Sequence, residues 1–197
     1  MFAKTFAGVM IGAALASIPA FAQEENVAYK NDATVQAFGS FVKSTTQNSV
    51  QQNATNSGGV LASYRYFFND HHGAEVNYGY SLNTQNYAAV QGVNSYSHEV
   101  SAAYIFRLPR HRWTPFALAG VGALVFEPKD FAAASTQSRP AFVYGAGADF
   151  NLSQHVFMRA EYRGLVYNSP TFDLAGLNGL DRTTHRAEPS VGFGYRF

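Results

Sequence analysis

The sequence predicts an all-β protein, an eight-stranded antiparallel up-and-down transmembrane β-barrel. Three observations lead to this fold class. Apolar and polar residues alternate with a period of two in many segments, which is typical of strands with one apolar and one polar face. The connections between these segments are alternately long and short. An apolar N-terminal segment with the features of an export signal precedes them.

The N-terminal segment has the three parts of a secretory signal peptide. Met1–Lys4 carries a positive charge, Thr5–Ile18 is almost entirely apolar, and Ala20-Phe21-Ala22 fits a small-x-small cleavage site. The alternative, a membrane anchor helix, is disfavoured by the cleavage motif. We therefore expect residues 1–22 to be a cleaved signal peptide, residues 23–32 a periplasmic lead-in and residues 33–197 the barrel.

Eight segments are predicted as strands. In the last of them, every second residue from Ala187 to Phe197 is apolar, and the residues between are mostly small or polar. The fifth is apolar on both faces, so its facing cannot be assigned. In chain order the segments are Ala33–Lys43, Gly58–Phe68, Ala74–Leu82, Ser95–Phe106, Trp113–Phe126, Pro140–Phe150, His155–Tyr167 and Arg186–Phe197.

The connections fall into two classes. Long polar loops are expected at Ser44–Ser57, Asn83–Asn94, Glu127–Ser138 and Asn168–His185. Tight turns are expected at Asn69–Gly73, Leu108–Arg112 and Asn151–Gln154. An even strand number, with long loops on one rim and tight turns on the other, is typical of outer-membrane barrels. Strands of about nine to eleven residues suffice to cross the hydrocarbon core when tilted.

The composition narrows the possible partners. The chain has 197 residues, a formal net charge of +1 and no cysteine. The small charge argues against a nucleic-acid partner, and the lack of cysteine removes disulfides and thiolate chemistry. We expect no cofactor, and outer-membrane lipids as the main partner. The residues expected to form aromatic girdles at the two membrane interfaces are Tyr64, Tyr66, Tyr78, Tyr80, Tyr96, Tyr104, Trp113 and Tyr195.

If the apolar faces contact lipid, the opposite faces fill the lumen with charge. An eight-stranded barrel has an interior just wide enough for side chains, so charges of both signs predict a salt-bridge core that plugs the lumen. The alternative is a charged ion pathway. Inward glycines such as Gly145 and Gly147 would leave room for long arginines. The expected lumen residues are Arg65, Glu75, Glu99, Arg159, Glu161, Arg163, Glu188 and Arg196.

No arrangement of residues predicts an enzyme or a metal site. His98, Glu99 and Ser101 suggest a hydrolase, but alternation sends His98 to one face and the other two to the opposite face. The adjacent His71 and His72 fall in a tight turn, where solvated side chains are expected.

The chain resembles the small OmpA/OmpX-type outer-membrane β-barrels. The signal peptide, the eight spans, the Arg159-x-Glu161-x-Arg163 strand and the ending Gly192–Phe197 carry the resemblance. It implies biogenesis through periplasmic chaperones and the barrel-assembly machinery. The sequence departs from full-length OmpA in having no peptidoglycan-binding domain after the barrel, so we do not expect a wall-tethering role. The assembly signal that the resemblance implies consists of Val191, Phe193, Tyr195 and Phe197.

Four functional hypotheses remain at this point. The first is a structural or surface-interaction role, in which four long extracellular loops rich in Asn, Gln, Ser and Thr bind proteins or glycans. The second is a narrow channel for small solutes, and the third is a lipid-modifying enzyme. The fourth is a soluble lipocalin-like barrel with its apolar faces inward. The position of Arg159, Glu161 and Arg163, inside or outside the barrel, separates the last hypothesis from the others.

Overall fold

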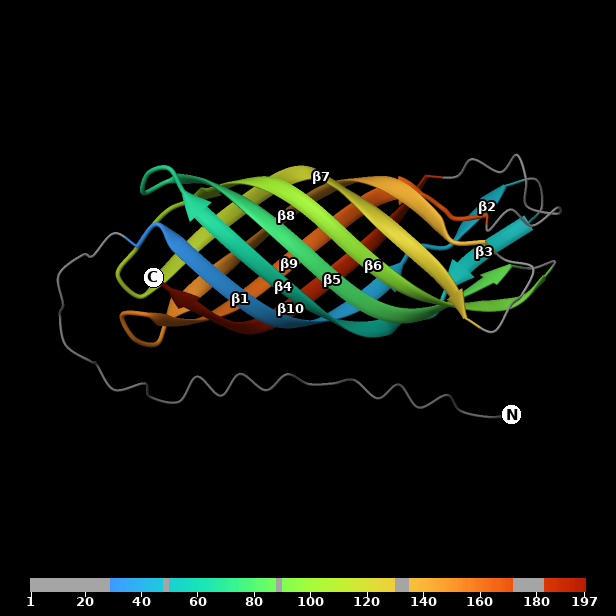
Figure 1. The fold of residues 1–197 in the computed structure, drawn as a ribbon, viewed down its shortest axis with the longest axis horizontal. Helices are drawn as coiled ribbons and strands as arrows, with labels where there is room; N and C mark the ends of the chain where they lie inside the picture. The colour runs from blue at the N-terminus through green and yellow to red at the C-terminus, as the bar shows by residue number, and fades with distance from the viewer. Residues whose placement is uncertain (1–28, 48–49, 88–89, 130–134, 172–182) are drawn as a thin grey trace, which may run out of the picture.

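The computed structural model describes residues 29–47, 50–87, 90–129, 135–171 and 183–197, which form a single closed β-barrel (Figure 1). Two short strands, β2 (Thr45–Gln47) and β3 (Val50–Ala54), lie outside the ring. The ring itself consists of β1 (Asn31–Val42), β4 (Ser57–Phe67), β5 (His72–Tyr87), β6 (Val90–Arg107), β7 (Trp113–Lys129), β8 (Gln137–Asn151), β9 (Val156–Asn168) and β10 (Thr183–Arg196).

Every strand of the ring pairs with its neighbours in antiparallel register. The order around the barrel is β1-β4-β5-β6-β7-β8-β9-β10, and pairing of β1 with β10 closes it, with Asp32 opposite Arg196 and Ala37 opposite Val191. Closure pairs the backbone N–H and C=O groups, which a hydrocarbon environment would otherwise leave unsatisfied at several kcal/mol each. The predicted eight-stranded antiparallel barrel is confirmed.

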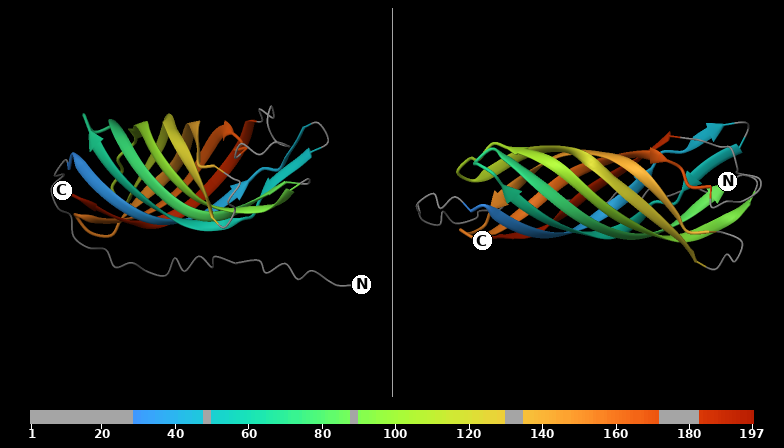
Figure 2. Two further views of the ribbon diagram at one scale, coloured as in Figure 1. Left: turned by 45° about the vertical axis from the view of Figure 1, so that its right-hand side comes forward. Right: turned by 45° about the horizontal axis from the view of Figure 1, so that its top comes forward.

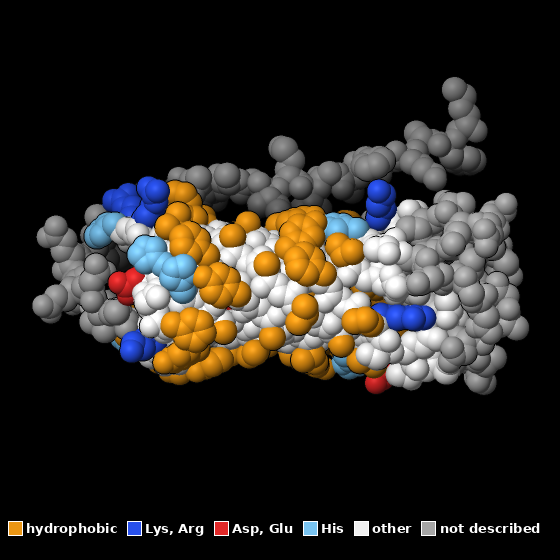
Figure 3. Space-filling model, turned by 90° about the horizontal axis from the view of Figure 1, so that it is seen from above, with side chains coloured by type: hydrophobic (Ala, Val, Ile, Leu, Met, Phe, Trp, Pro, Cys, Tyr) orange, Lys and Arg blue, Asp and Glu red, His pale blue; other side chains and the backbone are white. Residues whose placement is uncertain are grey.

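The two faces of the barrel wall differ as period-two alternation requires. The inner face holds the buried side chains, and the outer face exposes large apolar residues such as Val35 and Phe193, each 62% exposed. Figure 3 shows these apolar side chains as a band around the middle of the barrel, with charged and histidine side chains at its borders. The aromatic residues expected at the girdles all lie on the outer face.

The two rims differ in their connections, and Figure 2 shows them at opposite ends of the barrel. We call the end with the β4–β5, β6–β7 and β8–β9 connections the tight-turn rim, and the opposite end the long-loop rim. The first expected loop, Ser44–Ser57, contains β2 and β3, and β3 extends the sheet by pairing with the end of β5, with Gln52 opposite Tyr87. The connection expected to be a long polar loop therefore contains two short paired strands. Backbone pairing needs no apolar face, so a polar hairpin produces no period-two signal.

Several strands are longer than the sequence indicated. The connection expected at Asn83–Asn94 is largely a continuation of β5 and β6. At the other end β1 begins at Asn31, so Asn31 and Asp32 belong to the barrel rather than to a lead-in. The expected signal peptide lies outside the described residues. Within the described ranges, no helix is long and apolar enough to cross a membrane.

Candidate functional site

The lumen is filled with charged side chains that the alternation of the strands directs inward. Asp32, Arg65, Glu75, Glu99, Asp149, Arg159, Glu161, Arg163, Arg186 and Glu188 are all at most 5% exposed. They come from β1, β4, β5, β6, β8, β9 and β10. Charges removed from water to this degree are tolerated when they are paired and hydrogen-bonded.

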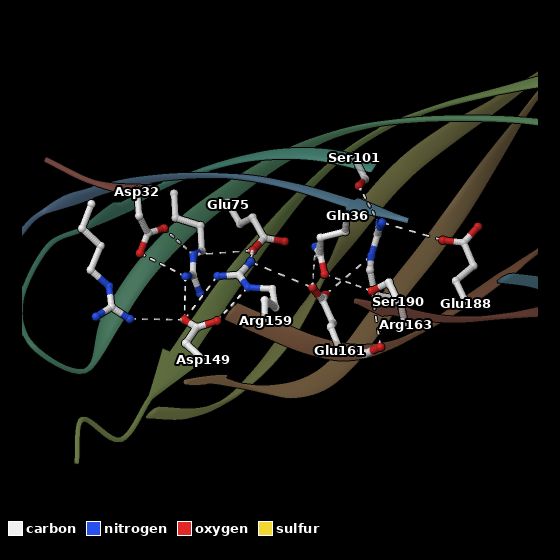
Figure 4. Close-up of polar contacts among 12 residues, drawn as sticks. Asp32, Gln36, Glu75, Ser101, Asp149, Arg159, Glu161, Arg163, Glu188 and Ser190 are labelled. Atoms are coloured by element: carbon white, nitrogen blue, oxygen red, sulfur yellow. Dashed lines mark hydrogen bonds and ion pairs between the residues drawn. The ribbon is translucent and has the colours of Figure 1, made fainter. Parts of the chain in front are cut away.

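Arg65 lies at the centre of the cluster nearest the tight-turn rim. Its Nε donates to Asp32 Oδ1 at 2.6 Å, and its Nη2 donates to Asp149 Oδ2 at 2.7 Å. Asp149 also accepts from Arg159 Nε at 2.8 Å, so one carboxylate joins two guanidinium groups. Arg159 Nη1 reaches Glu75 Oε2 at 3.3 Å. Figure 4 shows Asp149 and Glu75 on either side of Arg159.

Arg163 forms the centre of a second cluster, farther from the tight-turn rim. Its guanidinium contacts Glu99 in a close ion pair and donates to Ser101 Oγ at 3.1 Å. Glu188 Oε2 lies 3.7 Å from Arg163 Nη1. Glu161 joins the two clusters, with carboxylate oxygens 3.9 Å from both Arg159 and Arg163 (Figure 4).

Arg186 forms a third level of contacts. Its Nε lies 2.6 Å from Glu188 Oε1, and its two terminal nitrogens donate to Ser97 Oγ and Ser81 Oγ at 3.0 Å each. A buried guanidinium has five N–H groups, so small hydroxyl side chains on the facing wall provide acceptors that a single carboxylate cannot.

Some of these contacts, such as Asp149–Arg159, join neighbouring strands, but three of them cross the lumen. In the ring order, β4 and β8 are opposite strands, as are β5 and β9, and β6 and β10. Arg65–Asp149 joins the first pair, Arg159–Glu75 the second and Arg186–Ser97 the third. The barrel is therefore bridged across its full width by buried polar contacts between three pairs of opposite strands.

Aromatic rings surround the guanidinium groups near the tight-turn rim. The Arg65 guanidinium carbon lies 5.3–5.6 Å from the ring centroids of Phe67, Phe116 and Phe157. Small inward residues make room for these rings: a Cβ added to Gly147 would lie 2.7 Å from the Phe116 ring. Gly145 faces Arg163 as expected, with an added Cβ at 3.3 Å from its Cγ. The inward glycines thus accommodate aromatic rings as well as arginines.

Near the long-loop rim the inner faces of β7, β8 and β9 are apolar, opposite and beside the buried polar residues Ser97 of β6 and Arg186 of β10. Five buried side chains pack there, and we call them the apolar layer: Leu124, Phe126, Val143, Leu165 and Tyr167. The rings of Phe126 and Tyr167 are 5.9 Å apart. The sequence did not assign Leu124 and Phe126 to the lumen, because β7 is apolar on both faces and gives no alternation. Their pairing with the clearly alternating β6 and β8 would have revealed their facing.

Seven of the eight residues expected in the lumen lie fully inside and touch one another through the contacts above. The eighth, Arg196, lies at the tight-turn rim with its side chain 13% exposed, where it donates to Asn151 Oδ1 at 2.7 Å. Sequence reasoning missed Asp32, Asp149 and Arg186 as members. Counting back by two from Thr34 and from Glu188 would have placed Asp32 and Arg186 on the inner face.

The residues considered for catalysis are separated by the barrel wall. Ser101 Oγ donates to Glu99 Oε1 at 3.0 Å inside the lumen, whereas His98 lies on the outer face and its Nδ1 is 2.8 Å from the Tyr78 hydroxyl. His72, at the tight-turn rim, contacts the Tyr104 hydroxyl.

The position of Arg159, Glu161 and Arg163 inside the lumen removes the lipocalin-like hypothesis, which required the apolar faces to point inward. The residues of the expected assembly signal lie on the outer face at the end of β10, where Val191, Phe193, Tyr195 and Phe197 are all more than half exposed.

Solved structures of bacterial outer-membrane barrels share this fold. Ail, the attachment invasion locus protein of Yersinia pestis, is 19% identical with a TM-score of 0.57, over 86% of this chain and 99% of its own. OprG of Pseudomonas aeruginosa is 14% identical with a TM-score of 0.60, over 86% and 97%. Neisserial surface protein A is 14% identical with a TM-score of 0.64, over 85% and 97%. Ail has also been solved with the heparin analogue sucrose octasulfate, at 21% identity and a TM-score of 0.53, over 85% and 99%.

No curated protein sequence matches the chain. The family model described as "Outer membrane protein beta-barrel domain" matches residues 9–197, which include every strand of the barrel. With the closed eight-stranded ring, the apolar outer band and the polar lumen, this match establishes that the chain belongs to the outer membrane protein β-barrel domain family.

Proposed function

We propose that this protein is a plugged outer-membrane barrel that acts through its extracellular surface rather than by conducting solutes. The observation that supports the closed state is the bridging of three pairs of opposite strands by buried contacts. A permeating ion would have to separate these pairs. Each broken buried pair leaves an uncompensated charge at a cost of about 3–5 kcal/mol, which opposes spontaneous opening.

Single-channel recording of the refolded protein in a planar bilayer tests this proposal. A heat-modifiability gel first confirms that the protein is folded. We expect no current steps from the wild type. The variant Arg163→Ala, which removes the link between Glu99 and Glu188, is expected to show flickering steps, while the exposed-turn variant Arg112→Ala stays silent. Reproducible steps from the wild type would contradict the plugged state and favour the narrow channel.

The long-loop rim is proposed as the interaction surface. There β5 and β6 continue beyond the ring, and β2 and β3 join them in a polar extension of the sheet (Figures 1 and 2). Residues 45–54 are mainly Thr, Gln and Asn, whose side chains hydrogen-bond to hydroxyl and amide groups. The complex of Ail with a heparin analogue makes sulfated glycans the first ligands to test.

Binding of immobilised glycans by the protein in nanodiscs tests this part of the proposal. The control variant replaces residues 44–56, which include β2 and β3, by a short turn that leaves the ring intact. Binding of sucrose octasulfate, or of another glycan in the panel, by the wild type but not by this variant is the expected result. Equal binding by both proteins would exclude the hairpin as the binding surface.

We also propose that Val191, Phe193, Tyr195 and Phe197 form the signal read by the barrel-assembly machinery. They are presented on the outer face of β10, which closes the ring by pairing with β1. Phe193→Ala is expected to reduce assembly in cells and leave refolding in detergent unchanged. Loss of both assembly in cells and refolding in detergent would indicate that Phe193 has a packing role only.

A further inference from the structure

The tight-turn rim carries an unusual concentration of positive charge. The β6–β7 connection has the sequence Arg107-Leu108-Pro109-Arg110-His111-Arg112-Trp113, whereas the other two tight turns contain no lysine or arginine. Among the described residues, the only exposed acidic side chains are Asp70 and Glu127, and only Asp70 lies at this rim. Figure 3 shows basic and histidine side chains gathered at this end of the barrel.

The backbone of this turn is fixed from both sides. Arg107 Nε donates to the Asp70 carbonyl oxygen at 2.9 Å, and the Asn151 backbone N–H donates to the Arg112 carbonyl oxygen at 3.1 Å. The Asn151 side-chain amide donates to the His111 carbonyl oxygen at 3.3 Å. The turn is therefore bound to both neighbouring turns, and its exposed side chains project from a fixed frame.

Two guanidinium groups of this frame have no acidic partner among the described residues. Arg107 is engaged, with its guanidinium carbon 3.4 Å from the centroid of the Phe67 ring. Arg110 and Arg112 are exposed, and the contact of the Arg110 guanidinium is with the Trp113 ring, at 5.7 Å. Exposed cations without a carboxylate are available to an external anion.

Two apolar side chains in the same turn indicate the depth at which it lies. Leu108 is 42% exposed and Trp113 is 43% exposed, on the outer side of the wall. Tryptophan is enriched at the membrane–water interface of barrels, where one part of the ring contacts acyl chains and the other contacts headgroups. Arg110 and Arg112, beside Trp113, therefore lie at the level of lipid phosphates.

We infer that the Arg107–Trp113 turn binds the phosphate headgroups of anionic phospholipids in the leaflet that surrounds the tight-turn rim. Arginine recognises phosphate through paired, charge-assisted hydrogen bonds. The alternative anionic ligand on the periplasmic side is the peptidoglycan of the cell wall. Binding of peptidoglycan would not require Leu108 and Trp113 to be exposed to acyl chains. The site is independent of the loops on the opposite rim.

The single tryptophan of the chain makes the site directly measurable, because Trp113 reports only on its own surroundings. The wild type is reconstituted in phosphatidylcholine vesicles that contain either brominated phosphatidylglycerol or brominated phosphatidylcholine at equal mole fraction. Quenching of Trp113 then measures the local concentration of each lipid. A basic residue near an anionic surface contributes about 1 kcal/mol, or about fivefold in local lipid concentration, so two arginines correspond to an enrichment of up to about 30-fold.

We expect stronger quenching by the brominated anionic lipid than by the brominated zwitterionic lipid, and loss of the difference in high salt. In the variant R110Q/R112Q, the fluorescence of Trp113 should be quenched equally by both lipids. The matched control K43Q/K129Q, which removes two exposed cations from the long-loop rim, should behave as the wild type. The variant R110K/R112K, which keeps the charge, should retain most of the difference.

Equal quenching of the wild type by the two lipids would overturn the inference. A parallel sedimentation experiment mixes the nanodisc-embedded protein with purified peptidoglycan. Co-sedimentation that R110Q/R112Q abolishes, without lipid preference in the quenching experiment, would assign the turn to the cell wall instead and would also overturn it.

Discussion

The lumen near the tight-turn rim is closed by ion pairs between opposite strands, whereas near the long-loop rim packed apolar side chains of β7, β8 and β9 fill much of it, beside Arg186. The first region depends on directional contacts, in which each carboxylate must meet a particular guanidinium. The second depends on filling the volume of the lumen, and several different apolar residue types could do this. One barrel therefore contains two kinds of closure, and they should respond differently to substitution.

The largest effect is expected in the ion-pair region. Arg65→Met keeps much of the side-chain volume but leaves Asp32 and Asp149 without their shared partner. We expect the free energy of unfolding, measured by urea titration in lipid vesicles, to fall by about 3–5 kcal/mol. The double variant D32N/R65M should recover part of this loss, because Asp149 still pairs with Arg159. A double variant as unstable as R65M would show that packing, not charge, sets the cost.

A somewhat smaller effect is expected in the apolar layer. Leu124 is fully buried, and Leu124→Ala removes apolar volume without stranding a charge. We expect a loss of about 2–5 kcal/mol in the same titration, with its size following the cavity that remains. Leu124→Met conserves volume and should cost less than about 1.5 kcal/mol. If both variants were equally damaging, the layer would need a particular shape and not only a filled volume.

A position on the wall between these regions sharpens the comparison. Gly147 is inward on β8, and an added Cβ would lie 2.7 Å from the Phe116 ring. Gly147→Ala is expected to lower the free energy of unfolding by about 1–3 kcal/mol through overpacking. The added Cβ would also lie 2.5 Å from the Ala160 carbonyl oxygen, so the double variant G147A/F116L should recover only the part of the loss that comes from the Phe116 ring.

The smallest effect is expected outside the lumen. The Tyr78 hydroxyl lies 2.8 Å from His98 Nδ1 on the outer face. Tyr78→Phe removes this contact and should cost about 0.5–1.5 kcal/mol, the usual net contribution of one hydrogen bond. A loss as large as that of R65M would mean that the outer face contributes more than apolar contact with lipid.

The same contrast explains how much the sequence could reveal. Where one face is polar, as at Arg159, Glu161 and Arg163, period two identified the strand and its facing. Where both faces are apolar, as in β7, the same rule identified the strand but not which side of it fills the apolar layer. The partners of each charge depend on the register of strands far apart in sequence, so Arg65–Asp149 could not be predicted from either residue alone.

The extra length of β5 determines how far the sheet extends beyond the membrane. If Ala74–Leu82 spans the apolar core, Asn83–Tyr87 adds about 17 Å of strand at roughly 3.4 Å per residue. Pairing with β3 on one side and β6 on the other stiffens this part of the sheet. The end of β5 at Tyr87 is thus held at a set height above the lipid headgroups, at a distance where large molecules can approach it without touching the bilayer.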